Sequence, residues 1–287
     1  MSCPRIAIAT CSGYDRDKVD DDLLREALRE RGCEARSVVW DEDADWAAFD
    51  LCLVRSTWDY NRKYREFLNW ARQVETATTL RNPAALIAWN SNKTYLRELA
   101  QTGVRIVPTV WVERDSGIAL ADILEEQGWE DAVVKPVVDL GAENLHRVRA
   151  GDGKATAALA TVLERHDAMI QPFLPSLEAQ GELSLIYIDG KPTHAVRKRP
   201  APSDFRVQSI WGGTVAPDDP SQAEVELANL ALAQLNEPPL YARVDLVSGP
   251  DGHPCLIELE LIEPNLYLTQ HPPAAELLAT AALRLLS

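Results

Sequence analysis

The feature that most constrains this chain is the alternation of short apolar strands with amphipathic helices in its first 80 residues. Strand patterns cover residues 5–9, 35–40 and 51–54, and helical patterns cover 19–31 and 64–74. A helix between two strands returns the chain to the end of the sheet from which it started, so such strands pair in parallel. The sequence therefore predicts a layered α/β domain at the N-terminal end.

The pattern changes after Asn82-Pro83, a turn signal that also marks a predicted domain junction. Residues 90–100 predict one capped helix, and residues 104–112 predict a strand. Later apolar runs come in pairs around the dipeptides Asp189-Gly190 and Asp251-Gly252, which favour tight turns. Each pair predicts an antiparallel hairpin, namely 182–188 with 193–197 and 241–247 with 254–261.

The charge balance narrows the possible partners. The chain has 29 Lys and Arg against 44 Asp and Glu, a formal net charge of −15. Proteins that bind nucleic acids neutralise phosphates with clustered cations, so this balance argues against such a partner. The acidic surplus could be a solvated surface, or it could include a few carboxylates gathered around a cation.

The apolar runs argue against a membrane protein. All of them are far shorter than the roughly 18 residues that a membrane span requires. The first ten residues also lack the basic and apolar regions of a secretory signal. We therefore expect a cytoplasmic protein with no membrane partner.

A polar and aromatic segment, Arg55-Ser-Thr-Trp-Asp-Tyr60, directly follows the third predicted strand. Open α/β sheets bind their ligands at the carboxyl ends of the strands, where this segment lies. Two interpretations are open. The segment could cap a helix with Trp58 packed on the core, or it could bind substrate through Arg55, Ser56, Thr57, Trp58 and Asp59.

Two lysines are candidates for phosphate contacts. Lys135 ends an apolar strand at 132–136, where a buried ammonium group is costly unless it reaches solvent or an anion. Lys93 lies in the helix predicted after Asn90 and could be a second contact or a solvated helix residue. Neither lysine identifies a nucleotide by itself.

The apolar run at 168–174 contains Pro172, which cannot donate a ladder hydrogen bond. The strand must therefore leave the sheet or run at its edge. That would free backbone groups near Phe173 and Leu174 to bond an adenine edge. An ordinary edge strand that turns into a loop is the alternative.

Arg197-Lys-Arg199, with Arg206 a little further along, is the densest basic cluster of this acidic chain. Successive strand residues point to opposite faces, so Lys198 faces away from its two neighbours and at most one face lines a pocket. We expect Lys198 or Arg199, together with Arg206, to bind a phosphate or a carboxylate.

The final hairpin carries an unusual set of acids. Alternation puts Asp245 in phase with Arg243 on one strand and Glu258 in phase with Glu260 on the next. If the two faces coincide, three carboxylates meet beside one arginine. Such a group favours protons or a hard cation, and Mg²⁺ held by carboxylates and substrate phosphates fits. An exposed face with acids paired to Lys or Arg is the alternative.

In their order along the chain, these segments resemble the ATP-grasp superfamily of carboxylate ligases over about residues 83 to 270. The resemblance is carried by Lys93, 134–136, 171–174, 195–199, 205–208, Gly212-Gly213, 244–245 and 257–260. It is closest to the glutathione-synthetase and ribosomal-protein-glutamyl-ligase type. The segments at 55–60, 199–206 and 258–264 look like the subgroup that contains the D-cycloserine-forming O-ureido-D-serine cyclo-ligase.

The resemblance implies an ATP-grasp fold of the α/β and α+β classes. An N-terminal α/β substrate-binding domain, residues 1–82, would precede two α+β subdomains that enclose the ATP cleft. The first of these, a small lid, would cover 83–170, and the C-terminal subdomain with the metal site would cover 171–287.

The resemblance also implies roles for single residues, with ATP and Mg²⁺ as cofactors. By this resemblance, Lys93 and Lys135 would bind the ATP phosphates. The adenine would contact Gln171, Phe173 and Leu174, and the ribose would contact Glu178. Asp245, Glu258 and Glu260 resemble the Mg²⁺ ligands. The cations near the reacting groups would be Arg206, Arg243, Lys198 and Arg199.

Three positions depart from the family pattern. The loop after Lys135 has only Gly141 where relatives carry several small residues, so backbone amides approach the phosphates less freely. Glu260 stands where many members have Asn, which matches the cycloserine-type subgroup better than the glutamyl ligases. Ser184 replaces an arginine that is common in the ligases.

The predicted function is an ATP-dependent carbon–nitrogen ligase that activates a small amino-acid-type carboxylate as an acylphosphate for attack by an amine or similar nucleophile. The attack could be intramolecular, as in cycloserine-like antibiotic biosynthesis, or intermolecular, giving an amide. A non-catalytic ATP-binding protein is the alternative from another class. We expect a small amino-acid-like substrate and a homodimer.

Overall fold

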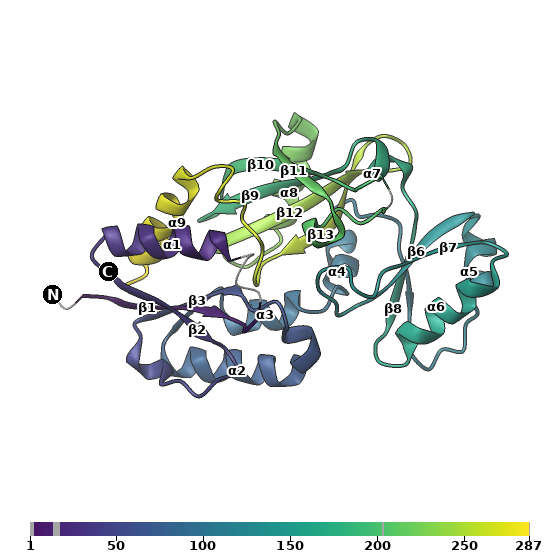
Figure 1. Ribbon diagram of the computed structural model, residues 1–287. Coiled ribbons are helices and arrows are strands. Elements are labelled where there is room, and N and C mark those ends of the chain that lie inside the picture. Colours follow the sequence, from purple (N-terminus) through teal and green to yellow (C-terminus); the bar gives the residue numbers. More distant parts are fainter. Residues whose placement is uncertain (1–2, 14–17, 203, 287) are drawn as a thin grey trace.

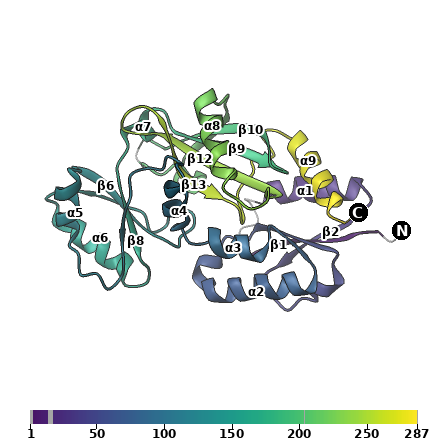
Figure 2. The same cartoon turned by 180° about the vertical axis from the view of Figure 1, so that it is seen from behind.

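The computed structural model describes residues 3–13, 18–202 and 204–286, without the side chains of 153–156, and the statements below concern these residues. They form three sheets. Figures 1 and 2 show the N-terminal sheet packed along one side of the largest sheet, with the third sheet set apart at the other end of the molecule. No helix in the described part is long and apolar enough to cross a membrane.

The N-terminal sheet has the strand order β2-β1-β3-β4, and its neighbouring strands are parallel. Its strands are β1 (Arg5–Thr10), β2 (Glu34–Val39), β3 (Leu51–Ser56) and β4 (Thr79–Arg81). Its helices are α1 (Val19–Glu30) and α2 (Tyr64–Ala77), with short 3-10 turns at η2 (Trp46–Ala48) and η3 (Tyr60–Lys63). The alternation of strands and helices therefore predicted this parallel layer correctly.

The lid sheet is antiparallel, in the order β5-β8-β6-β7. It consists of β5 (Val110–Val112), β6 (Asp131–Pro136), β7 (His146–Arg149) and β8 (Ala168–Pro172), covered by α5 (Leu120–Gln127) and α6 (Gly153–Leu163). β8 lies between two other strands, so it is not an edge strand. The chain leaves the sheet just after Pro172, which was the other expectation for this proline, but the Phe173 N–H is not free, because it donates to Asp131 O at 2.9 Å.

The largest sheet, the central sheet, has the order β11-β10-β9-β12-β13 and is antiparallel. Its strands are β9 (Glu182–Ile188), β10 (Lys191–Arg199), β11 (Thr214–Pro217), β12 (Tyr241–Ser248) and β13 (Pro254–Glu260). The remaining helices are α7 (Pro175–Ala179), α8 (Gln222–Leu232) and α9 (Pro273–Arg284), with a 3-10 turn at η4 (Ser209–Trp211). Both predicted hairpins are confirmed as β9–β10 and β12–β13.

The predicted helix over residues 90–100 is confirmed only from Tyr95 onward, and its predicted start at Asn90 is wrong. Two helices, α3 (Ala84–Asn90) and α4 (Tyr95–Gln101), flank a turn that contains Lys93. The Asn90 side chain bonds the backbone of Leu259 and Leu261 across the molecule, so this residue ends a helix instead of starting one. The backbone N–H of Lys93 donates to Val137 O at 2.8 Å, which joins the turn to the lid.

The strand predicted over 104–112 forms only in its last three residues, as β5. Pro108 has no N–H to donate to a ladder, and the preceding residues pair elsewhere. Ile106 bridges Leu256, and the Val107 N–H donates to the carbonyl of the same leucine at 3.1 Å. The segment is therefore a link between the central sheet and the lid.

One hydrophobic core joins the N-terminal sheet to the central sheet. It contains Ile6 and Ile8 of β1, Ile186 of β9, Tyr241 of β12 and Leu278 of α9, all buried. Helix α9 lies against α1, as both views show. The lid sheet has a separate core. The range boundaries predicted at 82 and 170 stay predictions, and β8 runs across the second of them.

Candidate active site

A cavity of about 280 Å³ lies where the three sheets meet. Trp58 and Asn61 line it from the N-terminal part, and the 135–145 segment lines it from the lid side. The central sheet and its loops contribute the charged residues Glu182, Lys198, Arg206, Arg243, Glu258, Glu260 and Glu263. Acids and cations from segments far apart in the sequence therefore face one shared cavity.

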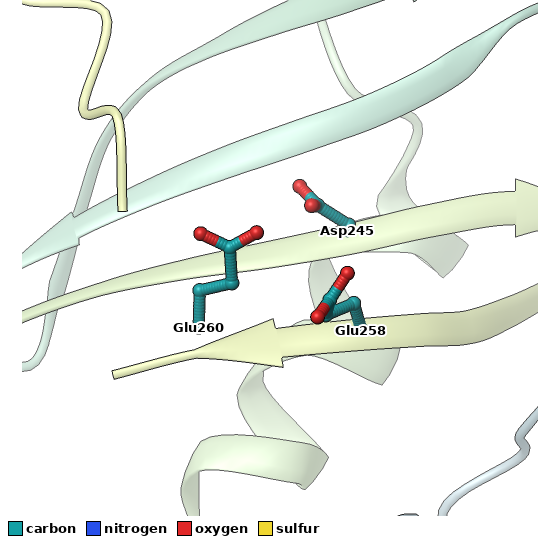
Figure 3. A group of neighbouring side chains, drawn as sticks. All are labelled: Asp245, Glu258 and Glu260. Atoms are coloured by element: carbon teal, nitrogen blue, oxygen red, sulfur yellow. The ribbon is translucent and has the colours of Figure 1, made fainter. Parts of the chain in front are cut away.

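Three carboxylates of the β12–β13 hairpin gather in this cavity. Asp245 pairs in register with Glu258, and Arg243 pairs with Glu260. Oxygen atoms of Asp245, Glu258 and Glu260 all lie within 4.8 Å of one another. Figure 3 shows the three side chains on the same side of the two strands, turned toward one another. The two faces coincide, which is the condition under which the sequence predicted a cation site, and oxygen ligands at this spacing suit a hard cation.

Arg243 holds two of these acids. Its guanidinium forms a two-pronged contact with Asp245, with Nε to Oδ1 at 3.0 Å and Nη2 to Oδ2 at 2.8 Å, and Nη2 also pairs with Glu260. Burial alone would raise the pKa of Asp245, but Arg243 and Lys198 outweigh it and lower that pKa. Burial, with repulsion from Glu258 and Asp245, raises the pKa of Glu260 to about 7 although Arg243 opposes the shift.

Lys198 is enclosed between two acids. Its ammonium lies 3.1 Å from Asp245 Oδ2 and also pairs with Glu182. Ser184 donates a hydrogen bond to Asp245 Oδ1 at 2.5 Å from the neighbouring strand β9. The serine that departs from the family pattern therefore binds a candidate metal ligand.

Two lysines face the cavity from the lid side. Lys93 Nζ lies 3.0 Å from Glu258 Oε1 and donates to Asp139 O at 2.8 Å. Burial lowers the pKa of Lys93, but Glu258 and Asp139 outweigh burial and raise it. Lys135 is buried without a salt bridge in the described part, and burial, only partly offset by Glu258, lowers its pKa to about 8. An anion entering here would stabilise the charged form of Lys135 and raise its pKa again.

The basic cluster divides as alternation predicted. Lys198 faces the cavity, whereas Arg197 pairs with Asp218 and Arg199 is exposed and donates to Ala179 O. Arg206 reaches the cavity from the loop after β10. Its guanidinium is held by Asp204, with Nη2 to Oδ2 at 2.7 Å, and it stacks on the Trp211 ring at 3.3 Å from the centroid.

The segment at 55–59 contributes mainly one side chain to the cavity. Trp58 lines it, and its indole N–H donates to Glu263 O at 3.1 Å. Arg55 is only 2% exposed; it donates to Pro264 O at 2.7 Å and lies over the Tyr241 ring. Ser56 and Thr57 are also fully buried, and Asp59 accepts a hydrogen bond from Trp40 Nε1 at 2.8 Å. Their substrate-binding role stays a prediction.

None of the predicted nucleotide contacts Gln171, Phe173, Leu174 and Glu178 lines the cavity. Gln171 Nε2 donates to Thr109 Oγ1 at 2.9 Å, and Glu178 pairs with Arg147 at 3.0 Å. Phe173 lies under that same arginine, 3.4 Å from ring centroid to guanidinium. Leu174 packs with Leu177, which does line the cavity. The assigned roles of these residues stay predictions.

Several lining residues had no predicted role, although Glu182 and Glu263 stand in segments that the sequence singled out. The group comprises Asn61, Asp139, Glu182, Glu263, Asn265 and Tyr267. Glu263 directly precedes Pro264 in the segment that carries the cyclo-ligase likeness, so its position was a usable signal. The others lie in loops or at a strand start, where periodicity gives no direction to a side chain.

The ATP-grasp domain of prokaryotic glutathione synthetase matches residues 95–251, more than half of the chain. The chain belongs to the ATP-grasp family. It is accordingly an ATP-dependent carbon–nitrogen ligase, as the sequence predicted. The N-terminal domain of the D-cycloserine synthetase DcsG matches residues 6–82.

Among curated proteins, the cycloserine biosynthesis protein DcsG of Streptomyces lavendulae is 32% identical over 266 residues, which cover 88% of this chain and 89% of the relative. The glutathione synthetase of Prochlorococcus marinus strain MIT 9313 is 32% identical over 173 residues, covering 59% of this chain and 53% of the relative. The first relative therefore matches along nearly its whole length, the N-terminal part included.

Solved structures agree with this fold. The crystal structure of D-cycloserine synthetase DcsG superimposes with a TM-score of 0.89 at 29% identity, covering 99% of this chain and 100% of the other. A D-alanine–D-alanine ligase from Bacillus anthracis gives a TM-score of 0.76 at 16% identity, covering 99% of each chain. At that identity the second match concerns the fold alone.

Proposed function

We propose that this ATP-dependent ligase activates the carboxylate of a small amino-acid derivative and closes a ring by intramolecular attack, in a cycloserine-like biosynthesis. The observation that carries the proposal is the match to DcsG over 88% of the chain, including the N-terminal domain that walls the cavity. The substrate would be an amino acid with a ureido or similar side chain.

The reaction balances in two steps. A carboxylate oxygen of the substrate attacks the γ-phosphorus of ATP, so ADP leaves and an acylphosphate forms. A side-chain nitrogen then attacks the carbonyl carbon, the bond from that carbon to the phosphate oxygen breaks, and the nitrogen loses a proton. No side-chain nucleophile of the protein is needed.

The chain's own residues supply charge and position. Lys93 and Lys135 would bind the phosphates of ATP, because both ammonium groups face the cavity beside the acid cluster. Arg243 would lie beside the activated carboxylate, held in place by Asp245 and Glu260. Fixed cations aimed at developing charge, and two reacting groups held in contact, lower the barrier.

The acid cluster fits Mg²⁺. Asp245, Glu258 and Glu260 offer oxygen ligands within 4.8 Å of one another, which suits one or two hard cations shared with phosphates. Mg²⁺, when bound, neutralises charge on the transferring phosphoryl group. Glu260 would then lose its proton readily, because a cation opposes the repulsion that raises its pKa.

The proposal is tested by incubating the protein with ATP, MgCl₂ and a panel of amino acids, O-ureido-D-serine included, and measuring ADP, phosphate and product mass. Ring closure consumes one amino acid per ADP, whereas intermolecular ligation gives a product of two joined units. No substrate-stimulated ADP release from any compound would refute the proposed function.

Glu258→Ala separates an enzyme from a protein that only binds ATP. Turnover should fall by at least about a hundredfold, as expected when a phosphoryl-transfer metal ligand is lost, with ATP affinity much less affected. Glu164→Ala is the control, since Glu164 is exposed on the lid and outside the cavity. Equal turnover in Glu258→Ala and wild type would refute the metal assignment. We expect the active enzyme to be a cytoplasmic homodimer.

A further inference from the structure

Glu263 is a buried acid whose carboxylate is paired with no other residue in the described part of the chain, although its own backbone contributes a hydrogen bond. Its residue is 6% exposed and lines the cavity. Within the described ranges, no other residue donates a hydrogen bond to its carboxylate and no cation forms a salt bridge with it. Burying a carboxylate is costly unless it is paired, so the position calls for a positive or donor group from a ligand.

The direction of β13 places Glu263 within the cavity. Ile257 packs with Leu174 and Leu177 at the start of the acid-bearing stretch. The chain then passes Glu258 and Glu260, and Glu263 follows where the backbone meets Trp58 of the N-terminal part. Glu263 therefore lies beyond the acid cluster, on the side of the cavity next to the N-terminal domain. That domain is the one that matches the N-terminal domain of DcsG.

A second acceptor lines the same cavity. Asn61 Oδ1 is buried and has no hydrogen-bond partner among the described residues. Asn61 follows Trp58 by three positions, in the 3-10 turn η3. The Glu263 carboxylate, which no other described residue bonds, and the unbonded Asn61 Oδ1 together fit a ligand group that carries several N–H donors.

Nearby protein cations are engaged elsewhere. Arg243 holds Asp245 and Glu260, and Lys198 holds Asp245 and Glu182. Burial and repulsion from Glu260 raise the pKa of Glu263 well above its usual range, and the distant charge of Lys93 only partly opposes them. A cationic ligand would therefore stabilise the charged form of Glu263 more than any of these side chains does.

The backbone around Glu263 is fixed before any ligand arrives. Its carbonyl accepts from Trp58 Nε1 at 3.1 Å, and the next carbonyl, of Pro264, accepts from Arg55 Nη2 at 2.7 Å. Asp20 accepts from the backbone N–H groups of Leu266 and Leu268 at 2.8 and 2.9 Å. Because these hydrogen bonds already hold the backbone, less conformational entropy is lost when the Glu263 side chain binds a ligand.

We propose that Glu263 binds the α-ammonium group of the amino-acid substrate, with Asn61 Oδ1 as a second acceptor. The substrate carboxylate would then point back along β13 toward Arg243 and the acid cluster. This inference rests on the proposed function, because it assumes that an amino acid occupies the cavity. It makes Glu263 a specificity residue that selects substrates with a free α-amino group.

Equilibrium binding tests the proposal without requiring turnover. Calorimetry would measure D-serine and O-ureido-D-serine, each with a free and an acetylated α-amino group, in the presence of MgCl₂ and a non-hydrolysable ATP analogue. Wild-type protein should bind the free form about 10- to 100-fold more tightly, as expected for a charge-assisted hydrogen bond. Glu263→Gln should abolish that preference while leaving the affinity for the ATP analogue unchanged. Glu164→Gln, the same substitution on the exposed lid surface, should keep the preference.

Each outcome decides one of the two proposals. Loss of the preference in Glu263→Gln supports the role of Glu263 even if no ADP is formed, in which case only the proposed function fails. The inference is overturned if wild-type protein binds neither probe or binds both forms equally, a readout that does not depend on the variant folding. It is also overturned if Glu263→Gln keeps the preference and loses only turnover, since that would make Glu263 a group acting on the reaction itself.

Discussion

At the scale of single residues, Lys135 is a buried lysine that has no salt-bridge partner among the described residues. The lysine ends β6 with its ammonium group at the cavity and no salt bridge within the described part of the chain. Its pKa is lowered to about 8 by burial. A bound polyphosphate would supply a negative partner for the ammonium group of Lys135. The affinity for ATP and the protonation of Lys135 should therefore be linked.

We expect the affinity for ATP to fall as pH rises above about 8. Below that pH the free protein holds the proton that the phosphates require; above it, binding must take up a proton, so affinity drops by up to about tenfold per pH unit. Calorimetric titration with a non-hydrolysable ATP analogue between pH 7 and 9.5 measures this. Lys135→Arg keeps its charge over the whole range and should flatten the curve. An equally steep curve in that variant would assign the titration to another group.

Sequence patterns predicted some site residues better than others. Alternation along β12 and β13 correctly brought Asp245, Glu258 and Glu260 together, because period-2 geometry fixes where strand side chains point. The same rule says nothing about a loop. Arg55 was predicted at the ligand edge of the sheet, yet its guanidinium turns inward to Pro264 O and the Tyr241 ring. Such a choice depends on partners more than 180 positions away.

At the scale of elements, the segment that follows β13 is an irregular stretch held by acceptors from other elements. Its backbone N–H groups at Leu266 and Leu268 donate to Asp20 of α1, and its carbonyl at Leu266 contacts His194 of β10. The segment carries Asn265 and Tyr267 into the cavity. The positions of Asn265 and Tyr267 in the cavity therefore depend on the buried Asp20, although its helix α1 does not line the cavity.

We expect Asp20→Ala to destabilise the fold and to weaken substrate binding. Two buried N–H groups would lose their acceptor, at a cost of about 2 to 5 kcal/mol in the free energy of unfolding. The KM for the amino acid should rise more than the KM for ATP, because the loosened segment lies beside Glu263. Denaturant unfolding and steady-state kinetics measure both effects.

The control for this change is Asp22→Ala, in the same first turn of α1. Asp22 is exposed, and among the described residues its side chain pairs only with Arg25, so its removal should cost less than about 1 kcal/mol. Similar losses in the two variants would mean that the helix terminus, not the bonds to the segment, accounts for the effect of Asp20.

Elements were predictable where their residues act locally. The five elements expected within the first 80 residues follow from periodicity, and both hairpins follow from Asp-Gly turns, where Asp189 and Gly190 adopt φ of 53° and 70°. The helix expected over 90–100 forms only from Tyr95, because Asn90 bonds a distant partner, the backbone of β13 and the residue after it. Capping patterns cannot show whether an asparagine bonds its own helix or a strand 170 positions away.

At the scale of the whole molecule, the N-terminal sheet and the central sheet are one packed unit. Helix α9 follows the central sheet in the sequence and packs against α1 as well as β9, and Arg31, directly after α1, pairs with Glu276 of α9. The fold class followed from the resemblance, but this joint core did not, because it consists of contacts between the two ends of the chain.

The distribution of the cores predicts how the molecule opens. Leu278 is fully buried in the joint core, and Leu159 is buried in the separate core of the lid. Truncating either side chain to alanine should cost about 2 to 5 kcal/mol. Hydrogen exchange read by mass spectrometry then shows which amides lose protection with each change.

Leu278→Ala should speed exchange in β1, β3, β9 and β12 together, because these strands contribute side chains to one core. Leu159→Ala should speed exchange in β6 and β8 and leave β1 and β9 unchanged, because the lid core shares no residue with the joint core. Faster exchange confined to the N-terminal sheet in Leu278→Ala would show that the joint core does not unfold as a unit. Because Lys135 and the segment after it line the cavity, separate opening of the lid would also change the shape of the cavity.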